Sequence, residues 1–227
     1  MQEQRPQPSL ASYIDQTLLK PEATSEQIRK LCQGALQYQF FGVCVNSGFI
    51  EQVSRELRGS SVTPVAVVGF PLGAMASAAK CFEAEWCVKN GAKEIDMVLS
   101  IGRLKEKDFD FVRQDIASVV KASAGALVKV ILETILLTED EKVTACALSL
   151  EGGAHFVKTC TGFAGGGASV TDISLMRSVV GPSVGVKASG GVKTTEHAWA
   201  LIQAGATRLG TSSGIELVQG KNSQGGY

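Results

Sequence analysis

Apolar residues follow two patterns that take turns along the chain. Short runs of consecutive apolar residues, such as positions 42–45 and 64–70, are typical of strands that are buried on both faces. Longer stretches between them carry apolar residues three and four positions apart, as a helix with one buried face does, and Thr24 and Thr138 each begin a capping box before such a stretch. Strands are predicted at residues 13–19, 42–45, 64–70, 94–99, 127–133, 155–158, 184–187 and 207–210. Helices are predicted at residues 24–36, 76–90, 108–123, 138–150, 170–180 and 195–204.

This alternation of strands and helices indicates an α/β fold with a parallel sheet covered by helices. We predict a single (β/α)8 TIM barrel at residues 13–218, with a flexible N-terminal segment at residues 1–12. A flexible tail is predicted at residues 219–227, ending in Tyr227. A doubly wound open sheet is the alternative, but no G-x-G-x-x-G turn follows the first strand to support dinucleotide binding.

Composition narrows the kinds of partner. The formal net charge is zero and there is no basic block or acidic tail, so we expect no nucleic acid and no membrane surface as a partner. The polar N-terminal stretch lacks the apolar run of a signal peptide, and no segment is long enough to span a bilayer, which predicts a cytoplasmic protein. The six cysteines form no CxxC pair, so we expect reduced thiols and no metal site. The expected partners are small molecules and a second copy of the chain in a homodimer.

A weak internal repeat links three of the predicted strands. Three times a helix stops at Gly-Ala and a strand follows, with the glycine suited to the left-handed residue after a helix. The residues five positions after these glycines are Asp96, Lys158 and Gly210. If the three units superpose, an aspartate and a lysine lie at equivalent depth in one barrel.

Ionisable residues interrupt several apolar strands: Asp96, Lys129, Glu133, Lys158 and Lys187. Catalytic groups of a barrel come from the C-terminal ends of different strands, so we expect these side chains to form a network at one mouth. A buried amine becomes neutral and can attack a carbonyl, a second cation nearby favours that neutral form, and a carboxylate moves protons. The repeat favours Lys158 as the nucleophile. Two alternatives remain open: a lysine that only pairs with a carboxylate, and Lys187 as a cation that positions phosphate.

Two loops rich in glycine and serine, at residues 186–192 and 209–214, follow the seventh and eighth predicted strands. Phosphate groups are usually bound at this place in a barrel by backbone N–H groups, and glycine allows the backbone to come close. The two loops together predict a phosphate site.

Motifs across residues 13–214 resemble those of deoxyribose-phosphate aldolases, a family of class I aldolases. They lie at residues 14–21, 43–46, 67–73, 94–98, 129–134, 156–159, 161–162, 187–191 and 210–213. The resemblance implies reversible cleavage of 2-deoxy-D-ribose 5-phosphate into acetaldehyde and D-glyceraldehyde 3-phosphate, with phosphosugar and aldehyde substrates and with no metal or organic cofactor.

The resemblance also implies roles for individual residues. Lys158 would form the Schiff base, Lys187 would be the second lysine that keeps it neutral, and Asp96 would relay protons. Supporting positions are Asp15, Thr17, Cys44, Glu133 and Tyr227. Substrate or phosphate contacts are expected at Thr161, Gly162, Gly190, Gly191, Gly210, Ser212 and Ser213.

The sequence departs from the family pattern at three positions. Gln16 stands where many relatives have histidine, and Phe163 stands where some carry a phosphate-binding lysine. Cys160 replaces a common serine, and strand alternation predicts that its side chain enters the same cavity as Lys158. We hypothesise that Cys160 or Cys44 is attacked by aldehyde products.

Two other functions compete with the aldolase. One is a phosphosugar isomerase or epimerase that uses its carboxylates for proton transfer without an imine. The other is a barrel that binds a phosphosugar and does not turn it over. An imine trapped on Lys158 would distinguish the aldolase from both.

Overall fold

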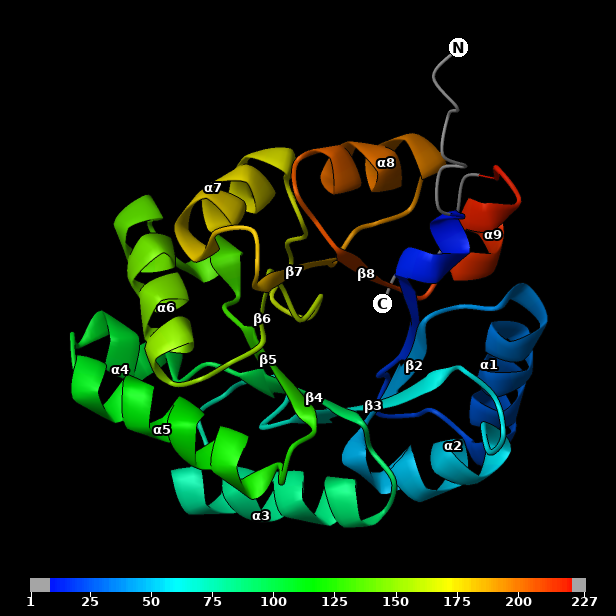
Figure 1. Cartoon of the computed structure of the whole chain (residues 1–227), viewed down its shortest axis with the longest axis horizontal. Coiled ribbons are helices and arrows are strands. Elements are labelled where there is room, and N and C mark those ends of the chain that lie inside the picture. The colour runs from blue at the N-terminus through cyan, green and yellow to red at the C-terminus, as the bar shows by residue number, and fades with distance from the viewer. Residues whose placement is uncertain (1–8, 222–227) are drawn as a thin grey trace.

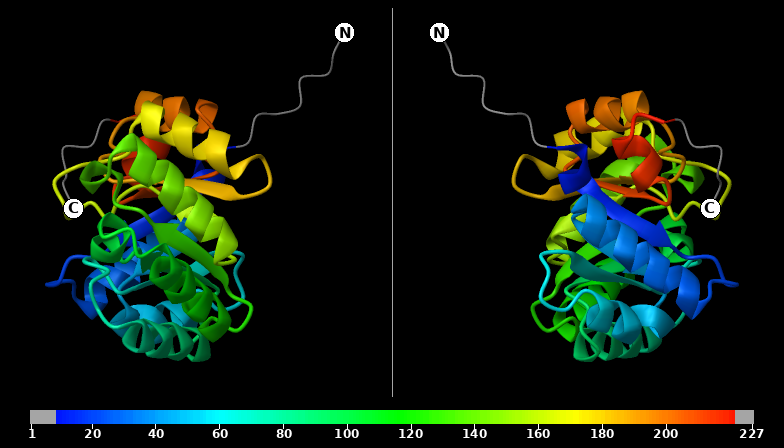
Figure 2. Two further views of the ribbon diagram at one scale, coloured as in Figure 1. Left: turned by 90° about the vertical axis from the view of Figure 1, so that its left-hand side faces the viewer. Right: turned by 90° about the vertical axis from the view of Figure 1, so that its right-hand side faces the viewer.

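The computed structural model describes residues 9–221 and shows a closed barrel of eight parallel strands that follow one another in chain order (Figure 1). The strands are β1 (Ile14–Leu18), β2 (Gly42–Val45), β3 (Thr63–Val68), β4 (Glu94–Val98), β5 (Leu127–Ile131), β6 (Phe156–Lys158), β7 (Gly185–Ser189) and β8 (Arg208–Thr211). Helices cover the outside of the strands, as the side views in Figure 2 show. The predicted single TIM barrel is confirmed.

The helices are α1 (Ser25–Tyr38), α2 (Ile50–Glu56), α3 (Ser77–Lys89), α4 (Ile101–Lys105), α5 (Phe109–Ala122), α6 (Glu139–Glu151), α7 (Val170–Val180), α8 (Thr195–Gln203) and α9 (Gly214–Val218). Both predicted capping boxes are present. The Thr24 side chain accepts from the Gln27 N–H while the Gln27 side chain accepts from the Thr24 N–H, and Thr138 and Glu141 repeat the arrangement at α6. These bonds satisfy N–H groups that the first turn of a helix leaves without a partner.

The helices α2, α4 and α9 are absent from the sequence prediction. Each is short, so its periodic pattern spans too few residues to stand out. Ordered structure also begins before the predicted boundary at residue 13. A 3-10 helix spans Leu10–Tyr13, and its Leu10 and Ala11 side chains are buried in the main core.

The main hydrophobic core lies between the strands and the helices. Ile28 of α1, Ile116 of α5 and Leu201 of α8 are all fully buried there, packed with the outward-facing side chains of the strands. This outer layer also buries a charged pair, in which Lys80 of α3 donates to Asp115 of α5 at 2.6 Å. Burial of the apolar side chains is the main force that holds the helices on the barrel.

Side chains inside the barrel lie at shared levels contributed by alternate strands, as is usual for this architecture. The strand register pairs Asp96 with Lys129, and Lys129 in turn with Phe156. Because the strands are tilted to the barrel axis, the residue at the height of Asp96 is not Phe156 but Lys158, two positions further along the same strand. The upper level is formed by Cys44, Asp96, Lys158 and Gly210. Beneath it lie Asp15, Val65, Lys129 and Lys187, and beneath these lie Gly42, Glu94, Phe156 and Arg208. The interior is therefore mostly charged, and the repeat predicted the shared depth of Asp96, Lys158 and Gly210.

Two glycines provide the space for these charges. A Cβ atom on Gly42 would lie 2.8 Å from Oδ1 of Asp15, and one on Gly210 would lie 3.0 Å from Cε of Lys187. Any larger residue at either position would displace a charged side chain.

Both tryptophans of the chain lie in the outer layer of helices. Trp86 is on α3 and is partly exposed, and Trp199 is on α8 with its ring packed edge to face on Tyr13. Among the residues described here, no helix is both apolar and long enough to cross a lipid bilayer.

Candidate active site

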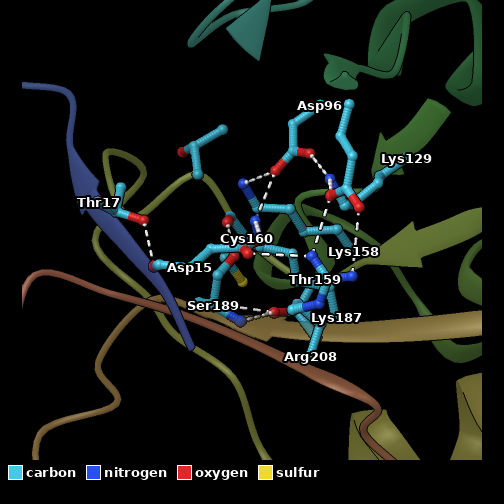
Figure 3. Close-up of polar contacts among 12 residues, drawn as sticks. Asp15, Thr17, Asp96, Lys129, Lys158, Thr159, Cys160, Lys187, Ser189 and Arg208 are labelled. Carbon is cyan, nitrogen blue, oxygen red and sulfur yellow. Dashed lines mark hydrogen bonds and ion pairs between the residues drawn. The ribbon is translucent and has the colours of Figure 1, made fainter. Parts of the chain in front are cut away.

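Lys158 and Asp96 meet inside the C-terminal end of the barrel (Figure 3). Lys158 is the last residue of β6, and its Nζ donates to Oδ2 of Asp96 at 2.9 Å. Burial alone would raise the pKa of Asp96, but the neighbouring lysines Lys129, Lys158 and Lys187 lower this pKa well below its ordinary value. The site therefore holds an ionised carboxylate in direct contact with a primary amine.

Lys187 of β7 binds the same carboxylate oxygen. Its Nζ lies 2.8 Å from Oδ2 of Asp96 and 2.5 Å from Oδ2 of Asp15. Burial works to lower the pKa of Lys187, but the two carboxylates outweigh it and raise the pKa above its ordinary value. Burial likewise works to raise the pKa of Asp15, and the cations of Lys187 and Arg208 lower it. Lys187 is thus a permanent ammonium that faces the carboxylates and not the glycine loop that follows its strand.

The charged network includes Lys129, which was expected there, and two residues that the sequence analysis did not name, Glu94 and Arg208. Lys129 of β5 donates to Oδ1 of Asp96 and to Glu94, each at 2.6 Å. Arg208 of β8 contacts Glu94 at 2.9 Å and Asp15 at 3.0 Å. Strand alternation gave a signal for Glu94 and Arg208, since they lie two residues before Asp96 and Gly210 and so share their faces.

Cys44 and Cys160 lie in different surroundings, which corrects the prediction for Cys160. Cys44 is on the level of Lys158, and the charges of Lys187, Asp96 and Lys158 act on its thiol, whose pKa is raised to about 11 chiefly by burial. The Cys160 thiol instead lies 3.4 Å from the Thr134 hydroxyl. Because β6 ends at Lys158, alternation no longer sets the direction of the Cys160 side chain.

Glu133 also lies apart from the lysines, although it was expected in their network. The strand β5 ends at Ile131, and Glu133 has a left-handed backbone with φ of 57°. Its carboxylate accepts from the Thr161 hydroxyl and from the Thr161 N–H, the latter at 3.2 Å. Glu133 therefore holds the loop after β6 in place.

The predicted phosphate contacts come from three neighbouring loops. The N–H of Ala168 donates to the carbonyl of Gly190 at 2.9 Å, and the Thr211 hydroxyl donates to the carbonyl of Val192 at 2.8 Å, so the loop after β7 is tied to the loops on both sides. Within residues 9–221, the backbone N–H groups of Gly162, Gly190 and Gly191 donate to no other protein atom. Donors of this kind remain available for an anion.

The remaining predicted site residues that the structure describes lie outside the charged network. Thr17 is buried, and its hydroxyl donates to the carbonyl of Asp15 on its own strand at 2.8 Å. Ser212 is partly exposed, and its carbonyl accepts from the side chain of Gln16. Ser213 is buried and its N–H donates to the Thr211 hydroxyl at 3.0 Å. Tyr227 lies outside the described residues.

An apolar wall faces the charged network across the barrel. It is formed by Leu19, Cys44, Val65, Val67 and Phe70. Phe70 follows β3, and its ring packs edge to face on Phe163 of the loop after β6, with ring centroids 5.2 Å apart. The two loops thus meet over the mouth, so a small aldehyde held by Lys158 would have apolar side chains on its other side.

The described residues include no set of three His, Cys, Asp or Glu side chains arranged to hold a metal ion. What the arrangement offers chemically is an amine, an adjacent ionised carboxylate and a second, permanently charged amine, all removed from bulk water.

The chain is similar to known aldolases both in sequence and in structure. Residues 9–220 match the family described as "DeoC/LacD family aldolase". A deoxyribose-phosphate aldolase of Bdellovibrio bacteriovorus is 56% identical over 96% of this chain and 99% of its own length, and one of Clostridium novyi is 55% identical over 96% and 100%. The tetrameric deoxyribose phosphate aldolase from Aeropyrum pernix superposes with a TM-score of 0.87 at 33% identity, covering 92% of this chain and 89% of that one.

Proposed function

Since the chain belongs to the DeoC/LacD family of aldolases, we propose that it cleaves 2-deoxy-D-ribose 5-phosphate reversibly through an imine on Lys158. The products are acetaldehyde and D-glyceraldehyde 3-phosphate. The observation that carries this assignment is the pair of lysines, Lys158 and Lys187, whose amines lie 2.9 Å and 2.8 Å from the same oxygen of Asp96. Both substrates and products are small molecules.

The reaction begins when the Lys158 amine attacks the aldehyde carbon of the open-chain sugar. Loss of water gives the imine, whose positive nitrogen withdraws electrons when the bond between C2 and C3 breaks and the C3 hydroxyl loses its proton. The resulting enamine takes up a proton at C2, and hydrolysis releases acetaldehyde and the free amine. Asp96 touches the reacting nitrogen and is the group placed to accept and return protons.

Lys158 must be neutral to attack, and Lys187 favours that state. Lys187 remains an ammonium because Asp15 and Asp96 raise its pKa. A second ammonium on the same carboxylate oxygen would be repelled by that of Lys187.

The phosphate of the substrate is bound by the loops after β6, β7 and β8. Support comes from the available N–H groups of Gly162, Gly190 and Gly191 and from the ties between these loops. Gly190→Ala tests this, because its φ of 88° and the Gly167 Cα only 3.0 Å from the added methyl leave no room. The KM for deoxyribose phosphate should rise about tenfold while activity on unphosphorylated deoxyribose is unchanged. Gly181→Ala, at a similar φ in open space, is the matched control.

A homodimer is the assembly that we propose. Support comes from exposed apolar side chains at Leu72 and Phe82, which are 74% and 70% exposed. Light scattering on the purified protein measures the assembly directly, and a monomer at micromolar concentration would contradict it.

The imine is tested by incubating the protein with acetaldehyde and sodium borohydride and locating reductive ethylation by peptide mass spectrometry. We expect the modification on Lys158 and its loss in Lys158→Ala. The peptide that carries Lys80, a buried lysine outside the barrel interior, is the control within the same digest. An adduct on Lys187 would reverse the two roles, and a folded protein with no adduct would favour the isomerase.

A further inference from the structure

The charged side chains inside the barrel form a closed ring. Going around it, Asp96 contacts Lys129, Lys129 contacts Glu94, Glu94 contacts Arg208, Arg208 contacts Asp15, Asp15 contacts Lys187, and Lys187 returns to Asp96. Acids and bases alternate throughout, and every contact is between 2.5 Å and 3.0 Å. Lys158 is attached to the ring at Asp96 and is not part of it.

The ring is neutral without Lys158. It holds three carboxylates and three cations, so an ammonium on Lys158 would be a surplus positive charge. The side chain of Lys158 is only 3% exposed, and an unbalanced charge in such a place is costly. The balance of the whole ring, not Lys187 alone, therefore disfavours protonation of Lys158.

We propose that the pair Glu94 and Arg208, on the side of the ring away from Lys158, sets the pH at which Lys158 becomes a nucleophile. Neither residue contacts Lys158, so both are positioning residues that act through the charge of the ring. This inference rests on the proposed imine on Lys158.

Arg208 is suited to fix the charge of the ring. Arginine keeps its proton at any working pH, whereas a lysine at this place could lose it. The guanidinium is 4% exposed, its Cζ lies 3.2 Å from the centroid of the Phe41 ring, and its two contacts hold Asp15 and Glu94. The contact with Asp15 passes the effect of Arg208 to Lys187, which shares Asp15.

Other titratable groups near Lys158 do not replace this pair. The other ionisable side chains that the strands contribute to the interior are Asp15, Cys44, Glu94, Asp96, Lys129, Lys187 and Arg208, and the loop after β5 adds Glu133. The strand β3 contributes only apolar side chains to this interior, at Val65 and Val67. Glu133 is bound to Thr161, and Cys44 is neutral because burial raises its pKa to about 11.

The test changes the charge of the ring by one unit in each direction. Arg208→Gln leaves the ring negative and favours protonated Lys158, so the acid limb of the pH profile should move to higher pH. Glu94→Gln leaves the ring positive and should move the limb to lower pH. Each shift should be about one pH unit. The double variant Glu94→Gln, Arg208→Gln restores neutrality and should return the limb toward its wild-type position.

The profile is measured in two ways: kcat/KM for cleavage of deoxyribose phosphate, and the rate at which acetaldehyde and cyanoborohydride ethylate Lys158. The matched control is Arg103→Gln and Glu106→Gln, a surface pair 3.2 Å apart with side chains that are 50% and 66% exposed, which should move neither limb. A purely structural role of Glu94 and Arg208 would lower activity in both variants without shifts of opposite sign.

Shifts of opposite sign support the inference, and a limb that is unmoved or moves the same way in both variants overturns it. If Arg208→Gln does not fold, the test depends on Glu94→Gln alone. An acid limb at lower pH than in wild type then supports the inference, and any other result refutes it. If wild type forms no adduct on Lys158, the proposed function fails instead, which separates the two failures.

Discussion

The interior of the barrel and the layer between its strands and helices are equally buried but filled by opposite kinds of side chain. The outer layer packs apolar residues such as Ile28, Ile116 and Leu201. The interior holds three carboxylates, three cations and the amine of Lys158 within three levels of side chains. Burying apolar surface stabilises a fold, whereas burying charges costs free energy that their mutual contacts offset only in part.

Because of this difference, we expect the outer layer to provide most of the stability and the barrel interior to carry out the chemistry. The outer layer stabilises the strands strongly enough for the interior to keep charges that a protein built only for stability would replace with apolar residues. Substitutions inside should therefore act mainly on activity, and substitutions of apolar residues outside should act mainly on stability. Lys80 and Asp115 are an exception, because this charged pair lies in the outer layer and Lys80 also donates to the carbonyl of Val98 at the end of β4.

The largest effect is expected inside. Asp96→Asn keeps the shape of the side chain but removes the carboxylate that contacts Lys158, so kcat for cleavage of deoxyribose phosphate should fall by about 10²–10⁴-fold. The control is Asp110→Asn on α5, whose side chain is 82% exposed. Loss of less than about tenfold would show that Asp96 takes no part in proton transfer.

In the outer layer the expected loss is of stability. Ile116→Ala removes a fully buried side chain and should lower the free energy of unfolding by about 2–5 kcal/mol in urea titrations. Activity per folded molecule should stay within about twofold, because Ile116 does not reach the interior. Val143→Ala, at a residue 38% exposed on α6, is the control. A large fall in kcat for Ile116→Ala would mean that the two regions are not separable.

Acid should lower the free energy of unfolding by protonating the carboxylates of Asp15 and Asp96 inside the barrel. The folded-state pKa values of Asp15 and Asp96 lie below the ordinary value of 3.8, so the stability that these ionised groups contribute is present above that pH. It is lost as the pH falls below about 4 and the carboxylates take up protons. Urea titrations between pH 3 and pH 6 should show this fall, and Asp15→Asn should make it shallower. An equally steep fall in the variant would assign acid unfolding to other groups.

The smallest effect is expected for Cys160. Its thiol contacts Thr134 and not the charged network, so Cys160→Ser should change kcat by less than about twofold. Cys44 lies at the level of Lys158 inside the barrel, and Cys44→Ser should slow inactivation in concentrated acetaldehyde where Cys160→Ser does not. Equal rates of inactivation in wild type and Cys44→Ser would contradict attack on Cys44.

The elements that could be predicted from sequence are those whose apolar run or helical spacing of apolar residues spans enough positions to be recognised. All eight strands and the longer helices follow from apolar runs and capping boxes, and the strand at residues 42–45 has its predicted bounds. The helix α2 was missed because its seven residues bury only Ile50 and Val53. The spacing of Ile50, Val53 and Leu57 was a weak helical signal that a longer element would have made plain.

The candidate site was predictable only where the strands are regular. Alternation and the repeat placed Asp96 and Lys158 together because both lie within strands. They failed for Glu133 and Cys160, which lie beyond the last strand residue, where the backbone turns. Closure of the ring by Arg208 depends on which strands are neighbours around the barrel, and a pattern within one strand carries no such information.

The position of the two tryptophans has a practical consequence for spectroscopy. Trp86 and Trp199 both lie on outer helices, so intrinsic fluorescence reports on the helical layer and is insensitive to the charges inside. A variant with a broken ring and intact helices would give native emission. Phe156 offers a place for an interior reporter, since its ring centroid lies 5.4 Å from Cζ of Arg208 and 5.9 Å from Nζ of Lys129. A tryptophan at position 156 would give a fluorescence signal that responds to changes in the barrel interior.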